Sequence, residues 1–271
     1  MRIGIVAPSR GLTRDVADRA LALAAQDFPQ ARLIIHPQCF LRDGHFAGPD
    51  AVRAAAFVDM ANDPEIDALW FARGGYGANR LLDAVMPALG PAARRKTYLG
   101  YSDGGFLLAA LYQAGIGRPV HGPMVADLAR DGGESAFARA LSFLVGGEQA
   151  GLQAQPELRI AMNLTILATL IGSRWLPELM GHVLMIEEVA EPMYRIDRML
   201  FQLASAPALR GLAGISLGRV TDVVANDPPW GEPVEQMIER CCATLGVAYL
   251  GRCDIGHDAD NMIVPFGGLS R

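Results

Sequence analysis

Short apolar segments alternate with helix-like segments through the first 117 residues of the chain. Apolar runs at residues 3–7, 31–36, 66–72 and 97–101 have the length and composition of buried strands. The segments between them, at 14–27, at 50–60, at 79–86 and at 106–112, carry apolar residues at helical spacing. This β-α-β-α order predicts an α/β fold, with a parallel sheet that helices cover on both faces.

A polar, glycine-rich and aperiodic stretch at residues 146–158 interrupts this order and predicts a linker. It divides the chain into an N-terminal domain at 1–145 and a smaller C-terminal α/β domain at 159–271. In the second part, strands are expected at 183–186, 212–217, 247–250 and 262–264, and helices at 192–206 and 234–244. A length of 271 residues suits one large domain or two medium-sized ones, and this stretch favours two.

Composition excludes several classes of function. The net charge of −5 argues against a nucleic-acid groove or a site for an anionic membrane surface. Of the 24 basic residues only Lys96 is a lysine, and no P-loop motif surrounds it, which excludes a P-loop NTPase. No C-x-x-C pair is present, so we expect buried thiols in a reducing compartment at Cys39, Cys241, Cys242 and Cys253. With no leader pattern and no run of about 18 apolar residues, the expected location is the cytoplasm.

A serine stands between the expected strand at 97–101 and the expected helix at 106–112. The sequence Gly100-Tyr101-Ser102-Asp103-Gly104 is a G-x-S-x-G pattern. In this pattern a sharp turn exposes the serine hydroxyl and directs backbone N–H groups toward the group that the oxygen attacks. A serine before a helix can also act only as its N-cap. Ser102 is therefore a candidate nucleophile, with capping as the structural alternative.

A nucleophilic serine needs a base, and the base needs a group that orients it. His257 lies in a loop between two apolar strands, where catalytic groups concentrate, and His121 is its rival. The remaining histidines are expected to be structural: His36, His45 and His182. Glu187 and Glu188 end an apolar strand and face opposite sides of it, so one can point to a histidine while the other is solvated. A carboxylate pair at a helix start is the structural alternative.

The loop Gly74-Gly75-Tyr76-Gly77 follows the third expected strand. It is not a G-x-G-x-x-G fingerprint, which argues against a dinucleotide site. Its glycines allow the backbone to approach a ligand closely and to present an N–H to an oxyanion. The structural alternative is a turn that requires positive φ.

Taken together, these motifs resemble those of the LD-carboxypeptidase family of serine peptidases, which includes murein tetrapeptide carboxypeptidases and microcin C immunity proteins. Each motif is short, but their joint order and spacing are specific, and they run through nearly the whole chain. The matching segments are residues 5–9, 72–77, 80–82, 100–103, 121–124, 163–165, 186–188, 194–200 and 256–257.

The resemblance implies a triad of Ser102 as nucleophile, His257 as base and Glu187 as orienting carboxylate. It also implies that the backbone N–H groups of Gly75 and Asp103 bind the oxyanion. The implied N-terminal domain is folded like class I glutamine amidotransferases, with the site between it and the C-terminal domain. The resemblance further implies a homodimer, and the chemistry calls for no cofactor and no metal. Arg73, or N–H groups at a helix start, is expected to bind the terminal carboxylate of the substrate.

The activity implied is the release of terminal D-alanine from murein tetrapeptide in the cytoplasm, through an acyl-enzyme. A second hypothesis keeps the triad but cleaves a peptidyl-nucleotide amide, with Trp175 or Trp230 as a platform for the base. A typical α/β-hydrolase esterase is disfavoured because no HGGG-type motif precedes Ser102. A non-catalytic ligand-binding relative is disfavoured because all three triad positions are filled.

Two short segments depart from the family's pattern. Gly104-Gly105 stands where larger residues are expected, and Ala161-Met162 precedes Asn163 where glycine is usual. Both departures bear on the substrate more than on the class of reaction.

Overall fold

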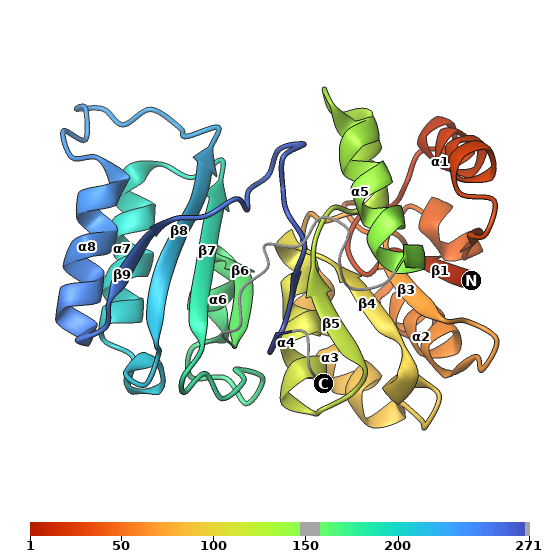
Figure 1. Ribbon diagram of the computed structural model, residues 1–271, viewed down its shortest axis with the longest axis horizontal. Coiled ribbons are helices and arrows are strands. Elements are labelled where there is room, and N and C mark those ends of the chain that lie inside the picture. Colours follow the sequence, from red (N-terminus) through yellow and green to blue (C-terminus); the bar gives the residue numbers. More distant parts are fainter. Residues whose placement is uncertain (147–157, 269–271) are drawn as a thin grey trace.

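The computed structural model describes residues 1–146 and 158–268, and its elements form two halves with a sheet in each (Figure 1). The sheet of the first half has six strands in the order β10-β5-β4-β3-β1-β2. Five of them run parallel to one another: β1 (Arg2–Val6), β2 (Arg32–Ile35), β3 (Ala68–Phe71), β4 (Thr97–Gly100) and β5 (Arg118–His121). The sixth, β10 (Val264–Pro265), comes from the end of the chain and pairs with β5 in the antiparallel direction.

Helices cover both faces of this sheet. Apolar residues of α1 (Arg14–Asp27) and α5 (Gly133–Gly146) pack on one face. Those of α2 (Asp50–Asn62), α3 (Leu82–Val85) and α4 (Gly105–Gln113) pack on the other. Short 3-10 turns lie between these elements: η1 (Pro37–Phe40), η2 (Ala78–Leu81), η3 (Met86–Ala88), η4 (Ala93–Arg95), η5 (Ser102–Gly104) and η6 (Val125–Ala129).

The second half has a smaller sheet of four parallel strands in the order β6-β7-β8-β9. Its strands are β6 (Arg159–Asn163), β7 (Val183–Val189), β8 (Gly214–Thr221) and β9 (Tyr249–Arg252). One face is covered by α6 (Leu164–Leu170), α7 (Met193–Ala204), α8 (Val234–Leu245) and the turn η7 (Pro207–Leu209). Residues between β9 and β10 cover the other face. Because both faces are covered, β6 and β7 are buried along nearly their whole length.

These observations confirm the predicted fold class of a parallel α/β sheet followed by a smaller α/β unit. The strands expected at 3–7, 31–36, 66–72 and 97–101 are β1 to β4, and the helix expected at 14–27 is α1. The single helix expected at 79–86 is wrong, because η2, α3 and η3 follow one another there. Pro87 contributes to this break since it has no N–H to donate to a helix. Most of the linker expected at 146–158 lies outside the described residues, and Gly146 still belongs to α5.

One hydrophobic cluster runs through both halves of the molecule. It includes Phe71 on β3, Phe106 on α4, Ile166 on α6 and Leu217 on β8. The contact between α4 and α6 therefore removes apolar surface from water where the halves meet, with a gain of roughly 25 cal/mol per Å². Core packing, and not only the pairing of β10 with β5, holds the halves together.

The four cysteines are buried, unpaired thiols, as expected. Burial raises the pKa of Cys39, Cys241 and Cys253 to about 12 and that of Cys242 to about 11. These thiols therefore stay protonated at neutral pH and act as small apolar side chains.

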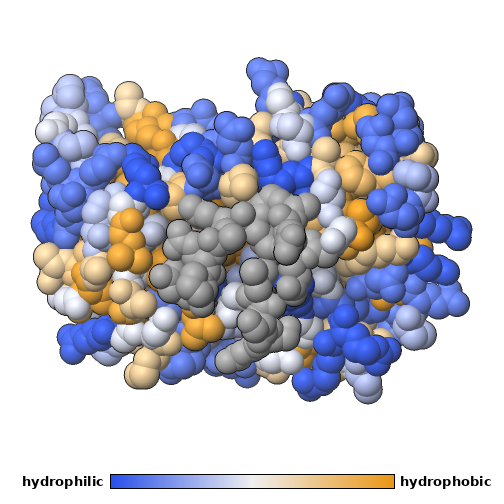
Figure 2. Space-filling view, in the orientation of Figure 1, coloured by the Kyte–Doolittle hydropathy of each residue, from blue (hydrophilic) through white to orange (hydrophobic). Residues whose placement is uncertain are grey.

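The surface is mixed in character. Figure 2 shows hydrophilic side chains over much of one face, with hydrophobic ones scattered among them. Among the described residues, no helix has the length and apolar character that crossing a membrane requires.

Two adjacent glycines should respond differently to substitution. A Cβ on Gly104 would lie 2.6 Å from Cδ2 of the buried Phe71, whereas a Cβ on Gly105 would lie 3.4 Å from Ile166. We expect Gly104→Ala to lower the free energy of unfolding by about 1–3 kcal/mol, because the core has no room for the methyl group. Gly105→Ala should leave stability unchanged or raise it by roughly 0.4–1 kcal/mol. Urea denaturation of both variants tests this, and equal losses would contradict it.

Candidate active site

Ser102 lies on a strained turn at the carboxyl end of β4. Its φ of +55° is in the left-handed region, which non-glycine residues seldom adopt. Gly100 and Gly104 on either side let the turn pass over the ring of Phe71, since a Cβ would come within 2.4 Å and 2.6 Å of that ring. The helix α4 begins immediately afterwards, at Gly105. The local sequence therefore forces the serine out of the strand and into the gap between the two sheets.

His257 lies on the segment that joins β9 in the second sheet to β10 in the first. Two anchors fix this segment. Arg219 of β8 donates to both carboxylate oxygens of Asp258, and Asn261 accepts from the backbone N–H of Gly256 at 3.1 Å. The imidazole is 8% exposed, so its position is set by packing and by hydrogen bonds.

Glu187 and Glu188 point to opposite faces of β7. Glu187 is on the same face as Met185, which packs against the segment between β9 and β10. Glu188 is on the face of α6, where it accepts hydrogen bonds from Asn163 Nδ2 and from the N–H and hydroxyl of Thr165, each 2.8 Å long. Glu188 is only 2% exposed. The expectation that the second acid is solvated is therefore wrong, because this sheet has no solvent-facing side here.

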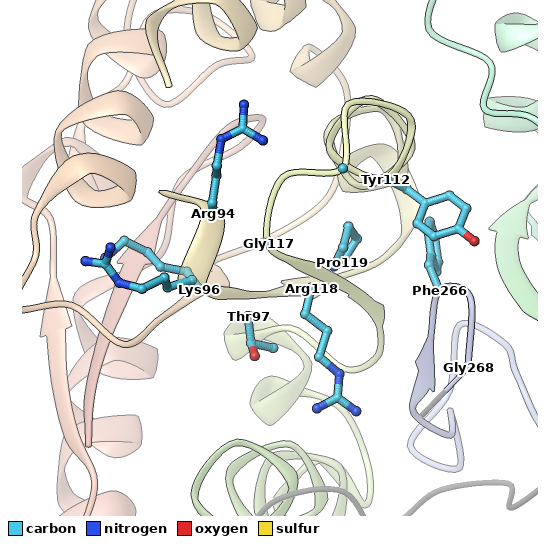
Figure 3. A pocket seen from close by; sticks show the side chains of 11 residues that line it. Arg94, Lys96, Thr97, Tyr112, Gly117, Arg118, Pro119, Phe266 and Gly268 are labelled. Carbon is cyan, nitrogen blue, oxygen red and sulfur yellow. The ribbon is translucent and has the colours of Figure 1, made fainter. Parts of the chain in front are cut away.

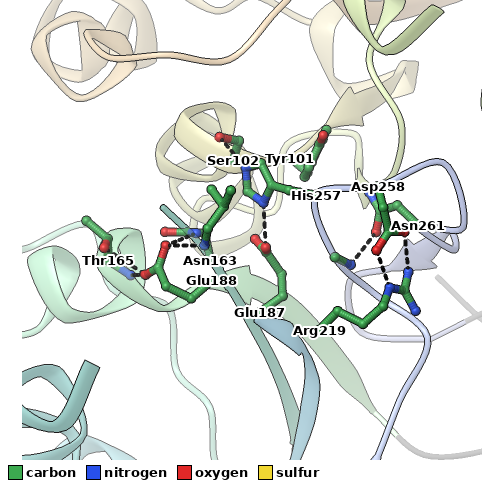
Figure 4. Close-up of polar contacts among 12 residues, drawn as sticks. Tyr101, Ser102, Asn163, Thr165, Glu187, Glu188, Arg219, His257, Asp258 and Asn261 are labelled. Atoms are coloured by element: carbon green, nitrogen blue, oxygen red, sulfur yellow. Dashed lines mark hydrogen bonds and ion pairs between the residues drawn. The ribbon is translucent and has the colours of Figure 1, made fainter. Parts of the chain in front are cut away.

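A continuous chain of hydrogen bonds joins the three side chains (Figure 4). Glu187 Oε2 lies 2.5 Å from Nδ1 of His257, and Nε2 of His257 lies 3.0 Å from Oγ of Ser102. With its Nδ1–H donating to the carboxylate, the imidazole keeps the Nε2 lone pair for the serine proton. Burial lowers the pKa of His257, but the charge of Glu187 and its hydrogen bond outweigh burial and raise the pKa above the usual value.

The ring of Tyr101 packs against the imidazole of His257. Its ring centroid lies 4.8 Å from that of His257, and its hydroxyl donates to Asp127 Oδ1 at 3.0 Å. Burial and the nearby charge of Asp127 raise the pKa of Tyr101 well above its usual value, so the hydroxyl remains a donor. Sequence reasoning missed this support, because Tyr101 occupies a position of the G-x-S-x-G pattern that accepts any residue and Asp127 belongs to no recognisable motif.

The glycine loop after β3 lies directly against Ser102. A Cβ on Gly74 would be 2.9 Å from the serine Oγ, so only glycine fits there. Gly75 follows with φ of +122°. Among the hydrogen bonds of the described residues, none uses the N–H of Gly75 or of Asp103. Both donors expected to bind an oxyanion are thus available next to the serine.

Buried polar side chains hold this loop in place. The Asp103 carboxylate accepts hydrogen bonds from the hydroxyl of Ser9 and from the N–H of Ala78. Arg53, which is 1% exposed, donates to the carbonyl oxygens of Pro8 and Gly77. Arg53 lies on the buried side of α2, and an isolated arginine in a helix gives no sequence signal of such a role.

The other histidines do not contact Ser102. His121 is buried, and its Nε2 lies 3.0 Å from Asn261 Oδ1; burial lowers its pKa. His36 accepts from the N–H of Gln38, and His182 lies 2.7 Å from the hydroxyl of Tyr112. The structure therefore brings together Ser102, Glu187 and His257, and leaves His121 in a supporting position.

A basic cavity of about 490 Å³ lies elsewhere, at the amino ends of β4 and β5. Arg94 and Arg118 line it, and Figure 3 shows their side chains pointing away from each other. Lys96 also lines it, but its ammonium group donates to the carbonyl oxygens of Asp63 and Ile66. The only lysine thus serves the fold. No group of three or more His, Cys, Asp or Glu among residues 1–146 and 158–268 could hold a metal ion.

The comparisons with known proteins agree with this arrangement. A family model described as the LD-carboxypeptidase N-terminal domain matches residues 3–122, and the model of the C-terminal domain matches residues 160–271. The chain belongs to the LD-carboxypeptidase family. The resemblance noted from its motifs is therefore confirmed, and the chain is a peptidase of this family.

Relatives of known name span almost the same length. The chain is 32% identical to a Synechocystis protein named as a carboxypeptidase, over 98% of this chain and 89% of that protein. It is 29% identical to the murein tetrapeptide carboxypeptidase of Pseudomonas aeruginosa, over 98% of this chain and 91% of that enzyme.

Two solved structures share the fold. The muramoyltetrapeptide carboxypeptidase from Oxalobacter formigenes aligns with a TM-score of 0.81 at 23% identity, covering 100% of this chain and 96% of that one. The microcin C7 self immunity protein MccF, in complex with aspartyl sulfamoyl adenosine, aligns with a TM-score of 0.80 at 20% identity, covering 98% and 91%.

The hydrogen bond to Glu187 predicts a specific pH response. A general base must be neutral, so kcat/KM for peptide cleavage should fall as the pH drops through the raised pKa of His257. Glu187→Gln removes the charge that raises this pKa and should move the acidic limb to lower pH. It should also lower kcat by up to about 10⁴-fold, because the imidazole is no longer held in the correct tautomer.

The matched control is Glu188→Gln, which changes the neighbouring acid without touching His257. Its acidic limb should stay at the wild-type position. A limb that is unmoved by Glu187→Gln, or moved equally by both variants, would contradict the assignment. Rate measurements from about pH 5 to 9 cover the usual histidine range.

Proposed function

We propose that this protein is a serine-type L,D-carboxypeptidase that releases the terminal D-alanine of murein tetrapeptide, in the cytoplasm, during cell-wall recycling. The observation that carries the proposal is the hydrogen-bonded chain from Glu187 through His257 to Ser102, which spans both sheets. Membership of the family and the similarity to the murein tetrapeptide carboxypeptidase of P. aeruginosa support the choice of substrate.

In this mechanism, Oγ of Ser102 attacks the carbonyl carbon of the last peptide bond while Nε2 of His257 takes its proton. The N–H groups of Gly75 and Asp103 stabilise the tetrahedral oxyanion, with roughly 3–4 kcal/mol from each donor in comparable sites. His257 then gives its proton to the leaving nitrogen of D-alanine, and the C–N bond breaks. Water, activated by the same imidazole, releases the tripeptide from the serine.

Glu187 keeps the imidazole oriented and stabilises its charged form between these two proton transfers. Its Oε1 has no hydrogen-bond partner among the described residues. The negative charge is thus directed mainly at His257, where it stabilises the imidazolium most.

We further propose that residues 1–145 and 159–271 act as two domains, joined by the linker, and that each supplies part of the site. The first supplies Ser102 and the oxyanion donors, and the second supplies Glu187 and His257. The partner of the chain is a small peptide substrate, and a homodimer is the proposed assembly by analogy with the family.

A peptidyl-nucleotide amide is the second candidate substrate. Trp175 and Trp230, which were considered as platforms for the base, are half-buried and pack against the core. Exposed rings lie instead beside the glycine loop, where Tyr76 is 49% exposed and His45 lies 6.4 Å from it between ring centroids. This aromatic surface is the observation that favours a nucleobase.

Incubation with murein tetrapeptide, followed by assay of free D-alanine, tests the proposal. The wild-type protein should release D-alanine, and Ser102→Ala should lower the rate by about 10⁶-fold, because the nucleophile is lost. Ser205→Ala is the matched control, because this exposed serine follows α7 and its hydroxyl donates to the carbonyl oxygen of Phe201, away from Ser102. Absence of release by the wild type, or release that persists in Ser102→Ala, would overturn the proposal.

A further inference from the structure

Two arginine side chains lie beside the glycine loop that contacts Ser102. Arg73 directly precedes Gly74, the residue packed against the serine Oγ. Arg10 follows β1, and its aliphatic part runs along Gly75, where an added Cβ would be 2.5 Å from its Cδ. Arg10 thus packs on a residue whose N–H is expected to bind the oxyanion, and Arg73 is close enough for the charge of Arg10 to act on it.

These two charges are not neutralised by the residues that the structure describes. Arg130, a third cation of the same cluster, forms an ion pair with Asp127 at 3.1 Å. No described carboxylate forms an ion pair with Arg10 or Arg73, which sets them apart from the paired surface arginines. The cluster therefore carries more positive than negative charge.

Burial and mutual repulsion make this excess of positive charge energetically unfavourable. Burial, followed by the charges of Arg10 and Arg130, lowers the pKa of Arg73. A guanidinium nevertheless stays charged at neutral pH, so the repulsion is not relieved by loss of a proton. Among the described residues, Asp127 is the one counter-charge that acts on Arg73, and it is already paired with Arg130. Three like charges held near a single counter-charge are typical of a site that binds an anion.

We infer that Arg10 and Arg73 form a subsite for an anionic group that the substrate carries next to its leaving nitrogen. This inference rests on the proposed function and deepens it. In a peptide that ends in D-alanine, the terminal carboxylate is one carbon away from that nitrogen. In an aminoacyl sulfamoyl nucleoside, that nitrogen is part of the acidic acyl-sulfamate, and the sulfonyl group that carries the oxygens is bonded to it directly. The two sources share one chemistry, a planar or tetrahedral oxyanion that accepts hydrogen bonds from two guanidinium groups.

Because the subsite is positively charged, it selects peptides whose cleaved bond is followed by a free terminal carboxylate. A substrate with a free terminal carboxylate gains contacts with both arginines, whereas the same peptide with a terminal carboxamide brings no charge. A chain that continues beyond the cleaved bond would place its next residue against the two arginines and bring them no carboxylate.

The test compares Arg10→Met and Arg73→Met with the wild type on murein tetrapeptide and on its C-terminal carboxamide, with formation of the tripeptide as the readout. Methionine keeps much of the side-chain length without the charge. We expect each variant to raise KM for the acid about tenfold or more, as for loss of a hydrogen bond to a charged group, with little change in kcat. The carboxamide should be a poor substrate for the wild type and should change little between variants.

Arg210→Met is the matched control, because Arg210 is exposed and follows η7, at the amino end of β8. Its kinetics should match the wild type on both substrates. The ratio of the cleavage rate of the acid to that of the carboxamide, measured on the same variant, corrects for any partly unfolded protein, since misfolding lowers both rates equally.

Binding to the Ser102→Ala protein separates this inference from the proposed function. Calorimetry with the tetrapeptide, its carboxamide and an aminoacyl sulfamoyl adenosine needs no turnover. If Arg10→Met and Arg73→Met on this background weaken only the tetrapeptide, the subsite is for a carboxylate; if they weaken only the nucleoside, it is for the sulfamoyl group. The inference would be overturned if neither arginine variant changed the affinity for the tetrapeptide or for the nucleoside. It would also be overturned if the Ser102→Ala protein bound the tetrapeptide and its carboxamide equally well and the arginine variants left nucleoside binding unchanged. Either result would stand even where D-alanine release depends on Ser102.

Discussion

The imidazole of His257 depends on a connection between two sheets. The segment that carries it leaves β9 in the smaller sheet and ends in β10, which pairs with β5 in the larger one. Its position is fixed at both ends by backbone hydrogen bonds and in the middle by Arg219 and Asn261. Ser102 follows a strand of one sheet and Glu187 lies on a strand of the other, and His257 on this connecting segment contacts both. The geometry of the site is thus a consequence of how the halves are joined.

The two neighbouring acids of the smaller sheet have different partners, since Glu187 bonds to His257 and Glu188 bonds to Asn163 and Thr165. The face that carries Glu187 is covered by the bridging segment, and the face that carries Glu188 is covered by α6. Burial raises the pKa of Glu188, although its hydrogen bonds with Asn163 and Thr165 act in the opposite direction. Glu188 therefore fixes the start of α6, which packs against α4, the helix behind Ser102.

Close packing explains one departure from the family's pattern. Gly104 has no room for a side chain because Phe71 fills the space, whereas Gly105 faces Ile166 at an ordinary contact distance. The large ring at Phe71 and the small residue at Gly104 thus form a complementary pair beneath the turn that carries Ser102. Nothing in the structure explains Ala161-Met162 beyond their burial in β6.

The sequence alone determined the order of strands and helices through residue 117, since their apolar periodicities are strong and local. It also pointed to Ser102 through its flanking glycines and limited the base to two histidines and the acid to two glutamates. The helix α5 was missed although Ala136, Phe137, Ala140 and Leu141 repeat at helical spacing; a fuller search for that period would have found it. The short α6 and the breaks around α3 have too few residues for a period to be visible.

Only the tertiary structure decided how the candidate site residues meet. The resemblance already implied His257 over His121, but the contact of His257 with Ser102 depends on the crossing of β10 to the first sheet, a pairing between residues more than 140 positions apart. The burial of Glu188 follows from the covering of both faces of β7, and the proximity of Arg10 to Arg73 follows from the adjacency of β1 and β3. Periodicity reports which side of an element is apolar, but it does not report which element covers that side, because long-range pairing leaves no local repeat in the chain.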